Sequence, residues 1–245
     1  MRIMEGPSVK IAADTMSNFV NKTVESVSGN TSIDKEVFLD AKVLDIFSRG
    51  KNLFIEFDKP ALKIHFGMYG TWRVNEEREG KTPRLGLQFY DGMINLYYCS
   101  VKIVSKETID KKYPEEIDIL SPNWILDEAI KMVKSESESM ICDVLLDQEI
   151  MPGVGNIIKN EALYKSSIHP ESIVEKIPPE EIIRLLEETR DFSIKWYKAK
   201  KRGEKIFPHF TIYRKSDCPE GKVTKKKTGN KKRWSYICPS QEKYA

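Results

Sequence analysis

The feature that most constrains the fold is a change in hydrophobic period near residue 118. From Val43 to Ile103 the chain consists of short segments rich in β-branched and aromatic residues, such as "KVLDIFSRGKNLFIEFD" and "LGLQFYDGMINLYYCSVKIV". Turn-forming residues interrupt these runs at four places, namely Arg49-Gly50, Asp58-Lys59-Pro60, Asn75 to Pro83 and Asp91-Gly92. Short strands at this spacing predict an antiparallel β-sandwich. One amphipathic helix is expected before it, over residues 8–20.

Beyond Asp118 the period becomes helical. Ser121 and Pro122 predict the start of one helix, with Leu126, Ala129, Ile130 and Val133 on one face. Helices are also expected over residues 140–148 and 179–200. The last 40 residues again show a pattern typical of β-strands, and Thr228-Gly229-Asn230 is the predicted tip of a hairpin. The predicted fold is α+β with three domains: residues 1–117, a β-sandwich with an N-terminal helix; 118–206, helical; and 207–245, a hairpin.

Charge is distributed unevenly along the chain. The net charge is only +3, yet residues 195–245 contain 16 Lys and Arg against 4 Asp and Glu. A solvated basic tail is one interpretation. Aromatic residues are interleaved with the lysines, which is uncommon in disordered segments; they are Trp196, Tyr197, Phe207, Phe210, Tyr213, Trp234 and Tyr236. An ordered surface that faces phosphates is therefore favoured.

Composition excludes some classes of protein. No apolar run approaches the roughly 18 residues of a membrane span, and the first residues lack the apolar stretch of a secretory signal. We expect an intracellular protein, cytoplasmic or nucleoid-associated. Its cysteines, Cys99, Cys142, Cys218 and Cys238, are expected to be reduced thiols. Cys99 and Cys142 have apolar neighbours in the sequence and are expected to be buried.

The segment "IMPGVGNIIKNEAL" (residues 150–163) concentrates backbone-shaping residues ahead of an apolar helical stretch. It joins two short helical segments, and its glycines permit a tight turn or a close approach to another molecule. Gly155 and Asn156 fall at the amino end of the second helix, where free N–H groups and the helix dipole favour an anion such as phosphate. An ordinary helical hairpin with a capping Asn is the alternative.

Several ordered motifs then resemble one family. They are "MEGPSVK" from Met4, "SRGKNL" from Ser48, "IHFGMYG" from Ile64, "LLDQEIMPGVGNIIKNEALYKSSIHP" from Leu145 and "RWSYICP" from Arg233. Together they resemble the formamidopyrimidine-DNA glycosylase and endonuclease VIII family, particularly its endonuclease VIII-like members. The resemblance implies a β-sandwich lobe, a helix-two-turn-helix lobe and a finger hairpin. It also implies a monomeric base-excision-repair glycosylase and abasic-site lyase that binds damaged DNA and flips out the damaged nucleotide.

The resemblance assigns roles to individual residues. Asn156, Lys51 and Arg233 are expected to contact phosphates, and Met68 to fill the gap that the flipped base leaves. On composition alone, Met68 reads as a core residue and Lys51 as a solvated turn lysine. His65 is read as a satisfied sheet histidine, and His169 as a helix-end residue rather than a base or a ligand.

The catalytic residues depart from the family pattern at one position. The family uses an N-terminal proline as the attacking amine and a neighbouring glutamate as proton donor. Here Glu5 keeps the acid's position, but Met4 replaces the proline, with Met1-Arg2-Ile3 ahead of it. A chain that begins at Met4 would present a primary amine beside Glu5. Alternatively, Lys51 supplies the amine, which requires its pKa to fall well below the usual value of about 10.4. If neither holds, the chain is a catalytically silent binder of damaged DNA.

The cysteines of the finger and the loop that would contact the strand opposite the lesion also depart from the family pattern. Zinc-bearing members carry two C-x-x-C pairs, whereas "CPEG" and "CPSQ" keep one cysteine each, so a zincless finger without cofactor is predicted. The loop "YYCSVKIV" lacks an Arg-x-Phe pattern, which predicts weak contacts to the opposite strand and tolerance of bubbles or single strands. Oxidised pyrimidines are the expected lesions. An RNA- or ribosome-associated protein is less consistent with Glu5, Lys51 and Met68 in this order.

Overall fold

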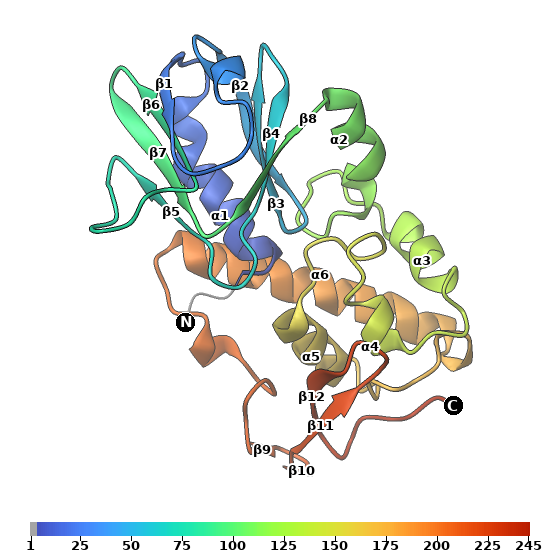
Figure 1. The fold of residues 1–245 in the computed structure, drawn as a ribbon. Helices are drawn as coiled ribbons and strands as arrows, with labels where there is room; N and C mark the ends of the chain where they lie inside the picture. Colours follow the sequence, from blue (N-terminus) through green and yellow to red (C-terminus); the bar gives the residue numbers. More distant parts are fainter. Residues whose placement is uncertain (1–3) are drawn as a thin grey trace. The chain divides into compact units, whose positions relative to one another are not determined.

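The computed structural model describes residues 4–245. The chain divides into two compact units, Met1–Pro114 and Glu115–Ala245 (Figure 1). Met1-Arg2-Ile3, which bear on the question of the amino terminus, lie outside the described residues. The predicted division into domains at residues 117 and 206 stays a prediction.

The first unit is a β-sandwich of two four-stranded antiparallel sheets, as the sequence predicted (Figure 1). One sheet has the order β1-β6-β7-β5: Val24–Ser28, Leu85–Phe89, Gly92–Tyr97 and Thr71–Val74. The other has the order β2-β3-β4-β8: Val43–Arg49, Asn52–Phe57, Ala61–His65 and Ser100–Val104. Helix α1 (Gly6–Met16) packs against β2 and β3, and α2 (Lys106–Lys112) follows β8. The expected helix over residues 8–20 is thus shorter, and its end is the 3-10 turn η1 (Ser17–Phe19); a second such turn, η2 (Glu36–Phe38), precedes β2.

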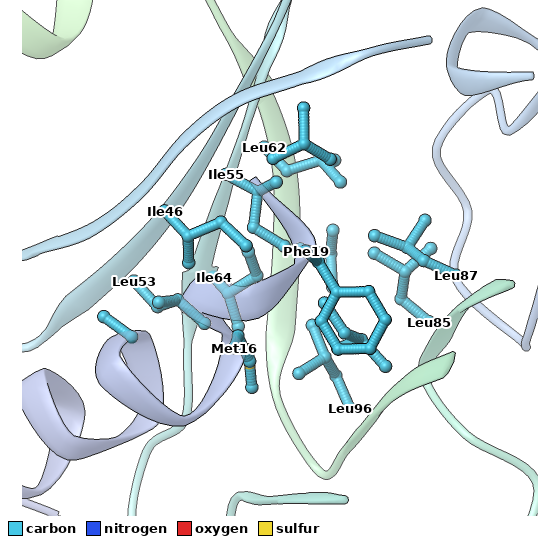
Figure 2. Close-up of a cluster of buried hydrophobic side chains, with 14 of the residues drawn as sticks. Met16, Phe19, Ile46, Leu53, Ile55, Leu62, Ile64, Leu85, Leu87 and Leu96 are labelled. Carbon is cyan, nitrogen blue, oxygen red and sulfur yellow. The ribbon is translucent and has the colours of Figure 1, made fainter. Parts of the chain in front are cut away.

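The core of this unit follows from the alternation of apolar residues along the strands. Leu53 and Ile55 of β3 and Leu62 and Ile64 of β4 are fully buried. Figure 2 shows these side chains gathered with Met16, Phe19, Ile46, Leu85, Leu87 and Leu96. Each such side chain contributes roughly 1.5–3 kcal/mol by leaving water. The two sheets therefore share one apolar interior, which fixes the turns at the ends of the strands.

The second unit is mainly helical. Its helices are α3 (Leu126–Lys134), α4 (Ile141–Val144), α5 (Asn156–Lys165) and α6 (Pro179–Lys201), and its 3-10 turns are η3 (Glu115–Ile117), η4 (Val174–Lys176) and η5 (Phe207–His209). Two small hairpins complete it: β9 (Asp217–Cys218) with β10 (Gly221–Lys222), and β11 (Thr224–Thr228) with β12 (Arg233–Ile237). The predicted hairpin tip around Gly229 is confirmed.

Two helix predictions need correction. The helix expected to start at Ser121 and Pro122 begins at Leu126, because the Ser121 hydroxyl instead accepts the N–H of Asn123 at 3.0 Å and closes a turn. The helix expected over residues 140–148 is reduced to Ile141–Val144, since the following residues enter the turns before α5.

The long helix α6 is predicted well because its signals are local. Pro178 and Pro179 stand at its start, Glu180 and Glu181 in its first turn, and three lysines in its last turn. Its buried face includes Phe192 and Trp196, which pack with Phe210 at centroid distances of 6.4 and 6.2 Å. Among the described residues no helix has the length and apolar character that crossing a membrane requires.

Candidate active site and nucleic-acid interface

One end of the sandwich gathers residues that the sequence singled out. The strand register pairs Asn52 with His65 and His65 with Ser100, so the β2–β3 turn that carries Lys51 lies beside the end of β4. The chain then passes through the β4–β5 turn, which carries Met68. Lys51 and Met68 therefore share one end of the sandwich, although residues 52–67, which include β3 and β4, separate them in sequence.

His65 is coupled to Lys51. The imidazole makes a hydrogen bond with the backbone of Lys51. Partial burial lowers the pKa of His65; the Lys51 bond opposes this, and the charges of Lys63 and Lys51 add to the lowering. A neutral imidazole at the strand end is thus favoured, which agrees with the reading of His65 as a sheet histidine with a satisfied hydrogen bond.

Met68 is not a core residue. Its side chain is 70% exposed, whereas its neighbour Phe66 is buried. Gly67 has φ +57°, and a Cβ on Gly70 would lie 2.3 Å from the Phe66 carbonyl oxygen. The two glycines thus permit a tight turn that presents Met68 to solvent. The exposure of Met68 removes the core alternative and leaves its role as a wedge as a prediction.

Met4 and Glu5 stand at the start of α1. Glu5 is the residue before the first helical turn, and its carbonyl accepts the N–H groups of Ser8 and Val9 at 2.9 and 3.3 Å. Pro7 in the first turn fixes the backbone there. Glu5 is 5% exposed, and Met4 packs half-buried against the sandwich core. The backbone of Glu5 is therefore fixed at the helix start, and its side chain is buried one residue after Met4.

The glycine-rich segment before α5 is a turn that the side-chain carboxamide of Gln148 stabilises. Gln148 donates from Nε2 to the Val154 carbonyl at 2.9 Å and accepts the N–H of Gly153 at 3.2 Å. Gly153 has φ +93°, which a residue with a side chain rarely adopts. Gly155 then precedes α5, and Asn156 is the first helical residue. The segment thus delivers Asn156 to the helix start, as its sequence predicted.

Three side chains of α5 converge on one carbonyl of the finger hairpin. The Trp234 oxygen accepts from Asn156 Nδ2 at 3.0 Å, Asn160 Nδ2 at 3.2 Å and Lys159 Nζ at 3.4 Å. Lys159 is fully buried, and its ammonium also donates to the Ser235 hydroxyl at 2.9 Å. Asn160 Oδ1 accepts the N–H of Tyr236 at 2.8 Å. Strand β12 is therefore attached to α5 by side-chain hydrogen bonds as well as by packing.

Two carboxylates extend this attachment. Glu161 is fully buried and accepts the backbone N–H groups of Thr211, Ile212 and Tyr213 at 2.8, 3.1 and 2.8 Å. Asp143 of α4 accepts two N–H groups at the tip of the β11–β12 hairpin, where a Cβ on Gly229 would collide with its carboxylate. Sequence reasoning missed Asp143, Lys159, Asn160 and Glu161. Consecutive polar residues inside an apolar helix were the available signal for the last three.

Asn156 and Arg233 line the same hollow. Its volume is about 730 Å³, and it is lined by Asn156, Tyr213, Arg214, Lys215, Ser216, Val223, Lys225, Arg233, Trp234 and Tyr236. Four of these residues are basic and none is acidic. The structure thus brings together the two phosphate-binding residues that were predicted in the second unit, in surroundings that favour an anion.

The cysteines need a correction. Cys218 and Cys238 form a disulfide that links β9 to the end of β12, whereas reduced thiols were expected. The sequence argument failed because their proximity depends on the folded finger. Cys99 and Cys142 are free; burial raises the pKa of Cys99 to about 12 and also raises that of Cys142. Cys142 is buried as expected, and Cys99 is half-buried.

The finger does not fit a closed structural zinc site. The described residues offer Cys218, Cys238 and Glu220, whose ligand atoms lie within 4.8 Å of one another, where tetrahedral zinc takes four ligands. The side chain of Gln241 accepts the N–H of Cys238 and donates to the Ile168 carbonyl. In the disulfide state neither sulfur is a thiolate, so neither can ligate zinc.

Reduction of the disulfide is expected to destabilise the finger. The bridge closes a loop with a sequence separation of 20, for which loop entropy predicts roughly 3 kcal/mol of stabilisation. Thermal unfolding with and without dithiothreitol measures this, and the Cys218→Ser/Cys238→Ser variant should no longer respond to the reductant. Identical melting of the unmodified protein in both conditions, or one zinc per chain in elemental analysis, would contradict a disulfide-closed finger.

Comparison with known protein families agrees with this architecture. The family model for the formamidopyrimidine-DNA glycosylase N-terminal domain matches residues 3–101, and the model for the H2TH domain of the same glycosylase matches residues 118–202. Endonuclease 8-like 3 of Mus musculus is 39% identical over 79% of this chain and 33% of its own length. The human endonuclease 8-like 2 is 30% identical over 81% of this chain and 67% of its own length. The chain spans about a third of the mouse relative.

Solved structures share the whole fold. A viral DNA glycosylase superimposes with a TM-score of 0.84 and 25% identity, covering 97% of this chain and 100% of that one. The formamidopyrimidine-DNA glycosylase of Lactococcus lactis, bound non-covalently to DNA with an abasic site, gives a TM-score of 0.83 at 22% identity, with 98% and 100% covered. On the two family models and the relatives together, the chain belongs to the formamidopyrimidine-DNA glycosylase and endonuclease VIII family.

Proposed function

We propose that the chain is a DNA glycosylase and abasic-site lyase of base-excision repair. The observation that carries the proposal is the acid-free hollow in which Asn156 and Arg233 lie together. A hollow with this lining attracts a polyanion, and the helix start at Asn156 suits one of its phosphates. The buried Glu5 beside Met4 supplies the acid, and the solved relative bound to DNA with an abasic site supports the substrate class.

The proposed reaction uses an amine as nucleophile. The lone pair of the Met4 α-amine, in a chain that starts there, forms a bond to the sugar C1′ while the bond from C1′ to the base breaks. The base leaves with the bonding electrons and takes up the proton that the attacking nitrogen releases. Glu5 donates a proton as the sugar ring opens, and a Schiff base results. Removal of a C2′ proton then expels the 3′ phosphate, which cleaves the strand, and water releases the amine. An α-amine suits this step because its pKa of about 7.7–8 leaves a neutral fraction at physiological pH.

Lys51 and Met68 have supporting roles in this proposal. Lys51 binds a phosphate near the reacting sugar, and Met68 occupies the space that the flipped nucleotide leaves. Exposure of Met68 on a tight turn and the position of Lys51 at the same end of the sandwich support both roles. The substrate is damaged DNA in duplex, bubble or single-stranded form, with oxidised pyrimidines as the preferred lesions, and the protein acts as a monomer inside the cell. No cofactor takes part.

A second function is favoured by one observation. Met4 stands where the family has its proline, and a chain that keeps residues ahead of Met4 has an amide nitrogen there. Such a chain would bind damaged DNA without incising it. Incubation with a duplex that contains one abasic site separates the two functions. Strand cleavage through a borohydride-trappable adduct supports the enzyme, and salt-dependent binding without cleavage supports the silent binder.

The role of Arg233 gives a prediction for either function. Arg233→Ala is expected to weaken binding to an abasic-site duplex and to reduce the slope of log affinity against log salt by about 1, because one phosphate contact is lost. Titrations by fluorescence anisotropy at several salt concentrations measure the slope. Arg202→Ala is the matched control, since the Arg202 guanidinium is already paired with Glu204. Equal slopes for the unmodified protein and Arg233→Ala would contradict the contact.

A further inference from the structure

The indole of Trp234 is exposed on the finger hairpin. Trp234 is 43% exposed, whereas Trp196 in α6 is completely buried. A large aromatic ring left partly in water is typical of a contact surface. Trp234 lines the hollow that Asn156 and Arg233 also line.

The hairpin register places cations around this ring. Lys227 pairs with Trp234 and Lys225 with Tyr236, so the four side chains share one face of the β11–β12 hairpin. The ammonium groups of Lys225 and Lys227 lie 4.4 and 5.4 Å from the centroid of the indole. The opposite face carries the buried Ser235 and Ile237. The hairpin therefore presents an aromatic and basic face to the hollow and buries the other.

Hydrogen bonds fix the backbone that carries the Trp234 indole. The Trp234 carbonyl is held by Asn156, Lys159 and Asn160 of α5, as described above. Beside it, the rings of Tyr213 and Tyr236 pack edge to face at a centroid distance of 5.1 Å. An aromatic platform held in this way loses little conformational entropy when a flat ligand stacks on it.

The lining of the hollow specifies the chemistry of its ligand. Its basic residues match a phosphate backbone, and the indole matches a flat apolar ring. A nucleotide combines the two, and about 730 Å³ lies within the range of pockets that hold small ligands. A base inside a duplex already has both faces stacked, so only an unpaired base can use the indole. Electrostatic grooves with stacking aromatics are how proteins bind single strands.

We propose that Trp234 stacks on an unpaired nucleobase of the DNA strand whose phosphates Asn156 and Arg233 bind. The stacked base is a neighbour of the damaged nucleotide, not the damaged base itself. This inference rests on the proposed function and adds a preference for unpaired DNA. It makes Trp234 a specificity-determining residue that acts without reading a base sequence.

The test uses the full chain and a 15-nucleotide single strand with a central tetrahydrofuran abasic analogue. In further strands, one flanking base at a time is removed while its phosphate is kept. For the unmodified protein, removal of one base is expected to raise the Kd about 10-fold, within the range measured for stacking of one base. Trp234→Leu should raise the Kd of the complete strand by the same factor and show no further loss when that base is removed. Trp234→Phe should retain most of the affinity.

Controls separate stacking from folding and from charge. Tyr90→Leu removes an aromatic ring that is 91% exposed on the β6–β7 turn, and it should bind as the unmodified protein does. The salt slope of Trp234→Leu should be unchanged, because no phosphate contact is lost. If Trp234→Leu unfolds, the base-removal series on the unmodified protein decides alone, since it needs no variant.

Three outcomes overturn the proposal. Additive losses from Trp234→Leu and base removal would show that the indole does not touch that base. Equal affinities across all strands would show that no base is stacked. Tighter binding to an RNA strand of the same sequence would assign the platform to RNA. Salt-dependent binding of the unmodified protein in the first two cases would leave the proposed function intact, whereas the absence of any DNA binding would remove both.

Discussion

Glu5→Gln is expected to reduce incision of an abasic-site duplex by about 10²- to 10⁴-fold, the usual contribution of a positioned proton donor. The carboxamide has nearly the same size as the carboxylic acid, so the buried position before α1 should tolerate it. Binding to the same duplex should therefore change little. Single-turnover incision on a denaturing gel gives the rate, and anisotropy gives the Kd.

Glu77→Gln is the matched control for this prediction. It makes the same chemical change at an exposed position between β5 and β6 and should incise normally. An unchanged rate for Glu5→Gln would remove Glu5 from the reaction. A parallel loss of rate and thermal stability in Glu5→Gln would instead assign Glu5 a structural role at the start of α1.

The second large effect concerns the amino terminus. A protein that starts at Met4 is expected to form a borohydride-trapped adduct with abasic-site DNA, and a protein that keeps Met1-Arg2-Ile3 should lose trapping and incision by roughly 10³-fold or more. The physical reason is that an amide nitrogen has no basic lone pair with which to attack C1′. Mass mapping of the cross-linked peptide identifies the residue that carries the sugar.

The same experiment distinguishes the alternative amine. A label on Lys51, or equal trapping of the two forms, would exclude Met4 as the nucleophile. Both forms should bind the abasic duplex with similar salt dependence, because the phosphate contacts lie elsewhere in the chain. Binding thus serves as the control that each form is folded.

Sequence reasoning succeeded where structure depends on local pattern. Short β-branched and aromatic runs separated by turn residues predicted the sandwich, the helical pattern over residues 179–200 predicted α6, and Thr228-Gly229-Asn230 predicted the hairpin. These signals lie within one element, so a single sequence contains them. The start of α3 was missed because the Ser121 side chain closes a turn, a choice that propensity alone does not distinguish from a cap.

The candidate site was harder to predict from the sequence, because its contacts join residues that are far apart in the chain. Asn160 meets Tyr236 across 76 positions of sequence, and Cys218 meets Cys238 only once both hairpins have formed. Such pairs leave no mark on local periodicity. Lys51 and Met68 were found through a family pattern and not from their own surroundings, whereas Asn156 was also singled out by its place at a helix start. The roles of all three in binding stay predictions.

The attachment of β12 to α5 has a consequence for how this unit unfolds. Lys159 and Glu161 are fully buried, and the side-chain hydrogen bonds described for them join residues 211–213, 234 and 235. Detaching the hairpin would leave an ammonium and a carboxylate of α5 without those partners, at a cost of several kcal/mol. The finger and the helices should consequently melt in one cooperative step. A protease that nicks the connection between α6 and the hairpin should leave both fragments associated until the whole unit denatures.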